Sequence, residues 1–299
     1  MSKQLRKRQR RSRASPPDAQ PSNLRRFTIR SWAITEQLLR RRRDRAAILD
    51  LMGFFDWLGD SNLEIIKRSL PPLPCKTGCD YCCYVSAEHP DVLPVEVFRI
   101  TSYLTGMGSA VQGVVRDRLR AAAAGAVEEA SSRSPCLFLT QNECLVYPVR
   151  PLRCRAQHSP DAEACRQSYL GHRDTIPLLS QPALLYESLQ TGIRLGLKDL
   201  GLQNSRLKLT GAIGVALQEP ESLTRWLTGA SVFLEVESPV AGDEERLVTQ
   251  FARQAKHQAR NEGRQLQSVI STLLERPGEW ASYTTSGIVP LGTDRSGKE

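Results

Sequence analysis

Apolar residues recur at helical spacing along much of the chain. The segment from 180 to 202, SQPALLYESLQTGIRLGLKDLGL, places Leu185, Leu189, Ile193 and Leu197 on one stripe, and the glycine near its end can stop a helix. Such an aliphatic stripe is typical of a face packed into the core rather than of a cofactor contact. The pattern therefore predicts a long helix with one buried face.

Local signals mark where other helices begin and end. The sequence SNLE at residues 61–64 fits a capping box, which predicts a short helix that ends before Pro71. Pro94 suits the first position of a helix that reaches Leu104 and is closed by Gly106. Periodicity or propensity predicts helices in four further segments: one that starts at Thr28, residues 110–130, residues 207–229 with a division at Pro220, and residues 243–275.

Two short apolar runs interrupt this helical pattern. PCLFL and CLVY are separated by TQNE, whose Asn142 suits a turn, so the pair predicts a small hairpin. The fold class we expect is mainly α, a helical protein with a small cysteine-rich metal-binding insert and a short β-hairpin. Five segments follow from the pattern: a disordered basic arm (1–26), N-terminal helices (27–70), a cysteine-cluster domain (71–170), a helical C-terminal part (171–276) and a flexible tail (277–299).

The positive charge is concentrated at the N-terminal end. The 299-residue chain has a formal net charge of +9, yet residues 1–45 hold fifteen Lys or Arg against three acidic residues, so the remainder is near neutral. The arm could make weak, nonspecific contact with nucleic acid or an acidic surface. The sequence is also compatible with a protein partner of unknown identity. No apolar run approaches the roughly 20 residues that span a bilayer, and no apolar segment follows the basic residues as in a secretory signal. We expect a cytoplasmic location.

All eight cysteines lie between residues 75 and 165, and four of them stand within the nine positions 75–83. In a reducing cytosol, such clustering favours metal ligands or catalytic thiols over disulfides. Gly78 permits a sharp turn among the first four, whereas Cys82 and Cys83 would point in opposite directions in extended backbone. The candidate metal ligands are Cys75, Cys79, Cys82, Cys83, Cys136, Cys144, Cys154 and Cys165.

The second group of cysteines can complete a site begun by the first. Cys154 follows Pro151 in the first turn of a predicted helix, where the helix dipole favours a thiolate. Arg150, Arg153 and Arg155 would offset the negative charge of a thiolate site. We prefer one main metal site, in which cysteines of the first block bind the metal and members of the second block complete the ligand set. Two sites with four cysteine ligands each are the alternative. Three aromatic side chains are expected to pack around the site rather than react: Tyr81, Phe138 and Tyr147.

Two other chemistries are known for clustered or reactive thiols. The spacing of Cys75, Cys79 and Cys82, with an aromatic residue before the last, matches the three-cysteine loop of radical S-adenosylmethionine enzymes. That loop follows a strand of a βα barrel, whereas here it follows a predicted helix and the break SLPPLP. Thiol catalysis would need a nearby histidine, and His158 lies four residues after Cys154, although we expect it to be a surface residue. The remaining histidines are His89, His172 and His257.

Several motifs in order resemble those of the YkgJ family, a bacterial group of zinc- or iron-chelating cysteine-cluster proteins. They are PCKTGCDYCCY with VLPVEVFRITSYL, then PCLFLTQNECLVYPVRPLRCR, and Cys165 in DAEACR, and the resemblance covers roughly residues 70–170. It implies a cysteine module that binds an iron–sulfur cluster or zinc. A related module in flagellin lysine N-methylases implies an alternative, protein lysine methylation. No glycine-rich loop after a strand supports a site for S-adenosylmethionine here.

The sequence therefore predicts a metal-binding cysteine-cluster protein. An iron–sulfur cluster is the preferred cofactor and zinc is the second choice, since thiolates bind both. The biochemical role is unassigned and the enzyme question stays open. The alternative is methylation or radical chemistry that depends on S-adenosylmethionine.

Overall fold

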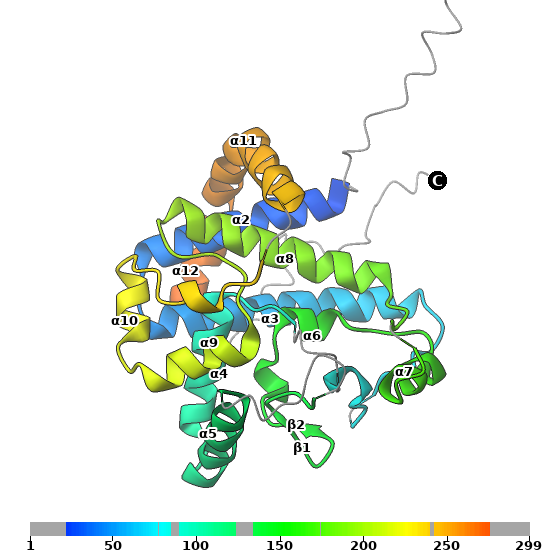
Figure 1. The fold of residues 1–299 in the computed structure, drawn as a ribbon. Helices are drawn as coiled ribbons and strands as arrows, with labels where there is room; N and C mark the ends of the chain where they lie inside the picture. The colour runs from blue at the N-terminus through cyan, green and yellow to red at the C-terminus, as the bar shows by residue number, and fades with distance from the viewer. Residues whose placement is uncertain are drawn as a thin grey trace, which may run out of the picture.

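A computed structural model describes residues 22–76, 78–84, 90–123, 134–173, 175–239 and 242–275. In this part of the chain there are eleven α-helices and one two-stranded antiparallel sheet (Figure 1). The predicted mainly α fold with a short hairpin is confirmed. None of the described helices is long and apolar enough to cross a membrane.

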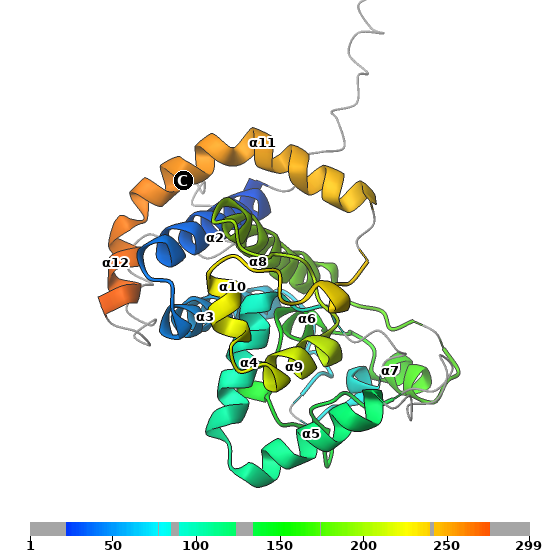
Figure 2. The same ribbon diagram turned by 60° about the vertical axis from the view of Figure 1, so that its left-hand side comes forward.

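Helices from the two ends of the chain pack on each other. Helix α2 (Ser22–Arg41) lies along α8 (Ser180–Asp199), and α11 (Gly242–Gln265) runs across α2 on the outside (Figure 2). The predicted stripe on α8 is buried, with Leu185, Leu189, Ile193 and Leu197 fully inaccessible. A second, smaller group of apolar side chains lies beneath α11: Ile29, Trp32, Leu195, Ala255 and Ala259.

The helices α2 and α8 approach each other closely because α8 carries glycine at the contact. A Cβ atom added at Gly192 would lie 2.5 Å from the Thr28 carbonyl oxygen and 2.9 Å from the Trp32 backbone nitrogen. Backbone atoms cannot yield as a flexible side chain can, so only a residue without a Cβ fits this contact.

Helix α3 (Arg45–Arg68) is a single continuous helix, so the predicted helix start at residues 61–64 is wrong. The N-cap of α3 is Asp44, whose carboxylate accepts a hydrogen bond from the Ala47 backbone N–H at 2.7 Å. Asn62 lies inside the helix, where its side chain donates to the Leu58 carbonyl at 2.7 Å. The buried face of α3 continues through Leu63, and this packing overrides the local capping signal.

Helix α4 (Pro94–Gly106) begins at the proline that the sequence marked and ends at the predicted glycine. Helices α9 (Leu209–Gln218) and α10 (Ser222–Leu227) divide at Pro220 as expected. The alanine-rich helix α5 (Ser109–Ala123) is present, and residues 124–130 of that prediction lie outside the described residues. Helix α12 (Gln267–Glu275) completes the predicted C-terminal helical segment.

The boundary of the predicted basic arm needs correction. Helix α2 begins at Ser22, so residues 22–26 are helical and Leu24 is buried. Residues 1–21 of the arm and the predicted tail 277–299 lie outside the described residues.

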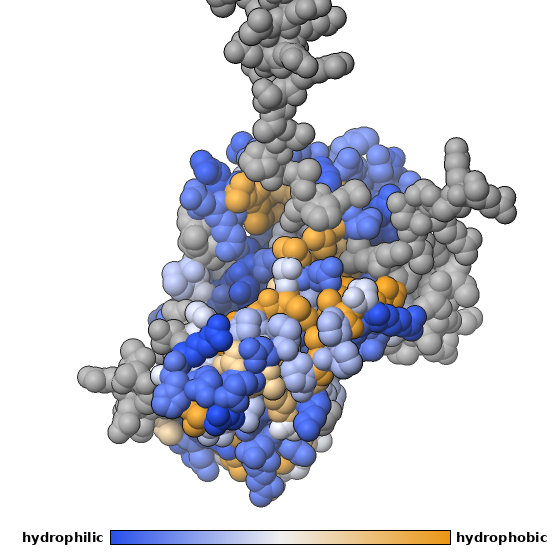
Figure 3. Space-filling model, turned by 90° about the vertical axis from the view of Figure 1, so that its right-hand side faces the viewer, coloured by the Kyte–Doolittle hydropathy of each residue, from blue (hydrophilic) through white to orange (hydrophobic). Residues whose placement is uncertain are grey.

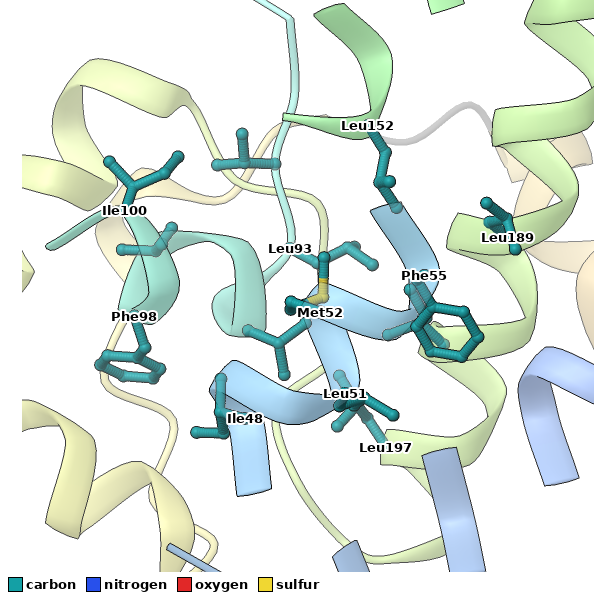
Figure 4. Close-up of a cluster of buried hydrophobic side chains, with 14 of the residues drawn as sticks. Ile48, Leu51, Met52, Phe55, Leu93, Phe98, Ile100, Leu152, Leu189 and Leu197 are labelled. Carbon is teal, nitrogen blue, oxygen red and sulfur yellow. The ribbon is translucent and has the colours of Figure 1, made fainter. Parts of the chain in front are cut away.

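The core joins α3, α4 and α8 to the chain that carries the cysteines. Figure 4 shows Phe55, Leu93, Leu152 and Leu189 among the buried side chains of this cluster. Leu152 opens α6 (Leu152–Ala156), so the short helix that carries Cys154 is anchored in the main core.

The cysteine-bearing segments lie beside this helical body. They comprise η1 (Tyr81–Cys83), the hairpin of β1 (Leu139–Thr140) and β2 (Glu143–Cys144), η2 (Tyr147–Val149), α6 and α7 (Ala162–Tyr169). Leu139 pairs with Cys144 in the hairpin, whose prediction is confirmed. Gln141 and Asn142 both have positive φ, 50° and 63°, as a tight two-residue turn of type I′ requires.

Candidate metal centre

Seven of the eight cysteines line one cavity of about 630 Å³. The cavity lies between the first cysteine loop, the hairpin, η2 and α6. The thiols that line it are those of Cys75, Cys79, Cys82, Cys83, Cys136, Cys144 and Cys154. The fold therefore brings together cysteines that are up to 79 positions apart in sequence.

Cys82 and Cys83 lie on the same 3₁₀ turn, η1, and their side chains hydrogen-bond to each other. The expectation that they point in opposite directions is wrong because it assumed extended backbone. Gly78, at φ +84°, gives the turn that precedes η1. The hydrogen bond from Cys83 lowers the pKa of Cys82 to about 7, whereas the same bond together with burial raises the pKa of Cys83.

A backbone hydrogen bond joins the two cysteine blocks. The Cys136 N–H donates to the Cys83 carbonyl at 2.7 Å, and the hairpin that follows carries Cys144 to the cavity wall. Burial raises the pKa of Cys136 to about 11. Burial therefore favours the neutral form of the Cys136 thiol when no metal is bound.

Cys154 on α6 lines the cavity together with Cys136 and Cys144. We expected the start of the helix to favour its thiolate, but burial raises the pKa of Cys154 well above that of an ordinary thiol. A five-residue helix has a small dipole, and the loss of hydration outweighs it. A metal ion would have to displace this proton in order to bind the sulfur.

Cys165 lies behind the first block rather than on the cavity wall. It is buried on α7, and its side chain hydrogen-bonds to that of Ser159. The Ser159 backbone N–H lies 3.4 Å from the Cys75 sulfur, so one residue contacts both cysteines. The ring of Tyr81 packs against Tyr169 of the same helix at 5.6 Å between centroids.

The three arginines of the second block have separate roles. Arg155 donates to Asp56 at 2.9 Å and to Asp60 at 2.5 Å, both on α3. Arg153 forms an ion pair with Glu187 of α8 at 3.3 Å. These two guanidinium groups are neutralised by carboxylates and hold α6 against the helical body, so the expectation that they balance the thiolates is wrong.

Arg150 is the arginine that acts on the thiols. It lines the cavity, its charge favours the thiolate forms of Cys82 and Cys144, and its guanidinium lies 4.0 Å from the Tyr147 ring centroid. Phe138 and Tyr147 also line the cavity, as expected for aromatic residues packed around the site.

A buried carboxylate that the sequence reasoning missed fixes the start of α6. Glu96 of α4 accepts hydrogen bonds from the backbone N–H groups of Leu152, at 2.7 Å, and Leu93, at 2.8 Å. Gln190 of α8 donates a third bond at 3.2 Å. Burial raises the pKa of Glu96 to about 7. Its place two residues after Pro94, which marks the helix start, was the only signal of a capping role, and nothing in the sequence indicated the contact with α6.

Residues 74–172 match the model of a known family, CxxCxxCC, whose description is "Putative zinc- or iron-chelating domain". This segment is a cysteine-cluster domain. It contains all eight cysteines and covers nearly the same span, roughly residues 70–170, in which the sequence predicted a cysteine-cluster module; the match does not carry the YkgJ name. No match was found among curated proteins or among solved structures.

His158 of the cysteine-cluster domain is buried, so the expectation of a surface histidine is wrong. It lines the same cavity as the thiols, and burial lowers the pKa of its imidazole. His172 is exposed at the end of the domain, and His257 is exposed on α11. His89 lies outside the described residues.

The donors of the cysteine-cluster domain surround a space without forming a coordination shell. All eight cysteines are free thiols. Within the described ranges, no three His, Cys, Asp or Glu side chains are gathered closely enough to hold one metal ion. The chemistry of the set nevertheless suits zinc or iron, because sulfur donors dominate it and cationic side chains stand beside them.

Proposed function

We propose that the protein binds metal through the thiolates of its cysteine-cluster domain, as an iron–sulfur cluster in preference to zinc. The observation that carries the proposal is the cavity lined by seven cysteines. A single zinc ion takes four ligands, so seven thiols around one space suit a polynuclear cluster or two ions better than one ion.

The surroundings of the cavity support an anionic centre. Lys67, Lys76 and Arg150 line it together with the thiols, and their charges would offset several thiolates. Phe138 and Val146 are buried on its wall and would limit contact with water. Apolar surroundings and nearby charge are among the features by which proteins tune a cluster.

The surrounding architecture does not favour the radical alternative. The cysteine loop follows α3 and a proline-rich break, and the only sheet among the described residues is the antiparallel hairpin. Radical S-adenosylmethionine enzymes build their cluster loop on a strand of a βα barrel. We therefore propose metal binding by the thiols, and not radical chemistry, as the function.

The test is to purify the full chain without oxygen, record its visible spectrum, and measure iron, zinc and inorganic sulfide per chain. A brown protein that contains iron and sulfide would support the cluster, and a colourless protein that contains zinc would support a zinc centre. Cys136→Ser and Cys154→Ser should lower the metal content in either case, whereas Ser109→Ala, at the start of α5 away from the cavity, should not. Protein that contains no metal and takes up none after reconstitution would overturn the proposal.

A further inference from the structure

His158 is a buried polar side chain without a hydrogen-bonding partner. Its exposed fraction is 9%, and neither ring nitrogen makes a hydrogen bond within the described part of the chain. Burying a polar group unpaired typically costs about 1–3 kcal/mol, so such groups usually have a role. The ring lines the cavity that the seven thiols share.

The backbone on both sides of His158 is held in place. Its N–H donates to the Ala156 carbonyl at 3.0 Å, and its own carbonyl accepts from the Leu179 N–H at 2.9 Å. The next residue, Ser159, donates its N–H to the Cys75 sulfur at 3.4 Å. The backbone at His158 is therefore fixed, the next residue contacts the Cys75 thiol, and both His158 and Cys75 line the cavity.

One ring nitrogen of His158 has a suitable outer partner. The Arg155 backbone carbonyl is near enough to favour a proton on the ring, although it falls outside hydrogen-bonding geometry. A histidine that binds a metal usually donates its other ring N–H to a carbonyl or carboxylate, which fixes the tautomer. Because the ring lines the cavity, a proton held on one nitrogen by this carbonyl would leave the other nitrogen free to bind a metal.

We propose that His158 supplies an imidazole ligand to the metal in this cavity, next to Cys75, and gives the centre a mixed sulfur and nitrogen donor set. The inference rests on the proposed metal-binding function. Both zinc and the [2Fe–2S] cluster accept histidine in place of cysteine, so the donor set is compatible with either metal. Cys75 and His158 come from opposite ends of the cysteine-cluster domain, so a shared metal would tie its two ends together.

The experiment uses the full chain loaded with Co²⁺ as a spectroscopic substitute, with affinity measured by competition against a coloured chelator. His158→Ala should weaken binding roughly 10- to 100-fold or more and change the cobalt spectrum. His158→Cys should restore affinity and add thiolate-to-metal absorption, which a merely structural role would not produce. His172→Ala, a change at an exposed histidine of the same domain, should leave both readouts at their wild-type values.

A second measurement does not depend on the folding of a variant. In wild-type protein labelled with ¹⁵N-histidine and loaded with zinc, one imidazole nitrogen should shift on binding, and that signal should be the one missing in His158→Cys. Normal metal binding without such a shift, or an unchanged affinity and spectrum in His158→Ala, would overturn the inference while the proposed function stands. Failure of the wild-type chain to bind any metal would instead overturn the proposed function itself.

Discussion

At the scale of single residues, a buried charge network holds the helix that carries Cys154. Arg155 is only 4% exposed and contacts both Asp56 and Asp60 of α3. Arg99 of α4 forms a second ion pair with Asp56, and the Tyr186 hydroxyl donates to Asp60 at 2.7 Å. Burial raises the pKa of Asp56 to about 6 despite the two arginines, so this carboxylate depends on its partners to stay ionised.

Replacing Arg155 with methionine should therefore destabilise the fold. The change keeps much of the side-chain volume but leaves Asp56 with one cationic partner, and we expect a loss of about 3 kcal/mol in the free energy of unfolding. The matched control is Arg153→Met, which removes a half-exposed ion pair to Glu187 and should cost less than about 1 kcal/mol. Urea unfolding of the metal-free proteins measures both, and equal losses would contradict the role assigned to Arg155.

Glu96 should make stability fall as pH rises. Its folded pKa of about 7 lies above the ordinary value of 4.5, so between these pH values the folded protein keeps a proton that the unfolded chain releases. The free energy of unfolding should decline by about 3 kcal/mol over this window. Glu96→Gln should remove that decline, and should also lower stability at pH 5 because one buried N–H loses its acceptor.

The comparison is made by urea unfolding of the metal-free proteins from pH 4.5 to pH 8. Asp56 contributes a slope of its own at the acidic end, but it is present in both proteins and cancels in the difference. A Glu96→Gln variant with the same pH dependence as the wild type would show that Glu96 keeps an ordinary pKa in the folded protein.

At the scale of helices, the contact between α2 and α8 tolerates no added atom. Gly192→Ala should lower the free energy of unfolding by roughly 1–3 kcal/mol or more, since the new methyl group meets the backbone at Thr28 and Trp32. The control is Gly113→Ala inside α5, where an added Cβ meets nothing within 4 Å. That change should stabilise the protein by about 0.5–1 kcal/mol, because alanine is the better helix former. The opposite signs can be read from thermal or urea unfolding, and a neutral Gly192→Ala would disprove the close contact.

The helices could be predicted from local signals, whereas the details of the site could not. Pro94 and the α8 stripe marked their helices correctly because capping and periodicity act over a few residues. The SNLE sequence wrongly predicted a helix start, because burial of Leu63 keeps α3 continuous through this segment. The turn that brings Cys82 and Cys83 together is local, but the cysteine spacing did not distinguish it from extended backbone. The pairing of Arg155 with α3 and the burial of His158 depend on segments far apart in the chain, and a single sequence does not report such contacts.

At the scale of the whole molecule, exposed apolar side chains and positive charge belong to different segments of the chain. On the face shown in Figure 3, hydrophobic residues occur in separate groups between hydrophilic ones. Four of the exposed large apolar side chains belong to α7, α8 and the chain between them: Tyr169, Leu170, Leu178 and Leu184. The strongest charge asymmetry lies instead at the N-terminal end, where residues 1–21 hold seven Lys or Arg against one Asp.

Deletion of residues 1–21 should separate the basic arm from the metal-binding body. Helix α2 begins at Ser22, and its Arg25 lies 5.1 Å from the Phe251 ring centroid of α11, so a cut at residue 26 would remove the first turn of this helix whereas this one keeps α2 whole. We expect unchanged metal content and unfolding, together with weaker, less salt-sensitive retention on a heparin column. Retention that persists at the wild-type salt concentration would show that the arm does not carry the polyanion contact.

The pairing of α2 with α8 has a consequence for how the protein is made. The two helices lie side by side, yet about 140 residues separate the end of one from the start of the other, and every cysteine falls in that interval. At translation rates of about 5–20 residues per second, the face of α2 that packs on α8 stays unpaired for roughly 7–30 seconds, and the cysteines are synthesised one after another within that time. Oxidation or premature metal capture in that interval would act on a cysteine cluster that still lacks the α8 side of its support.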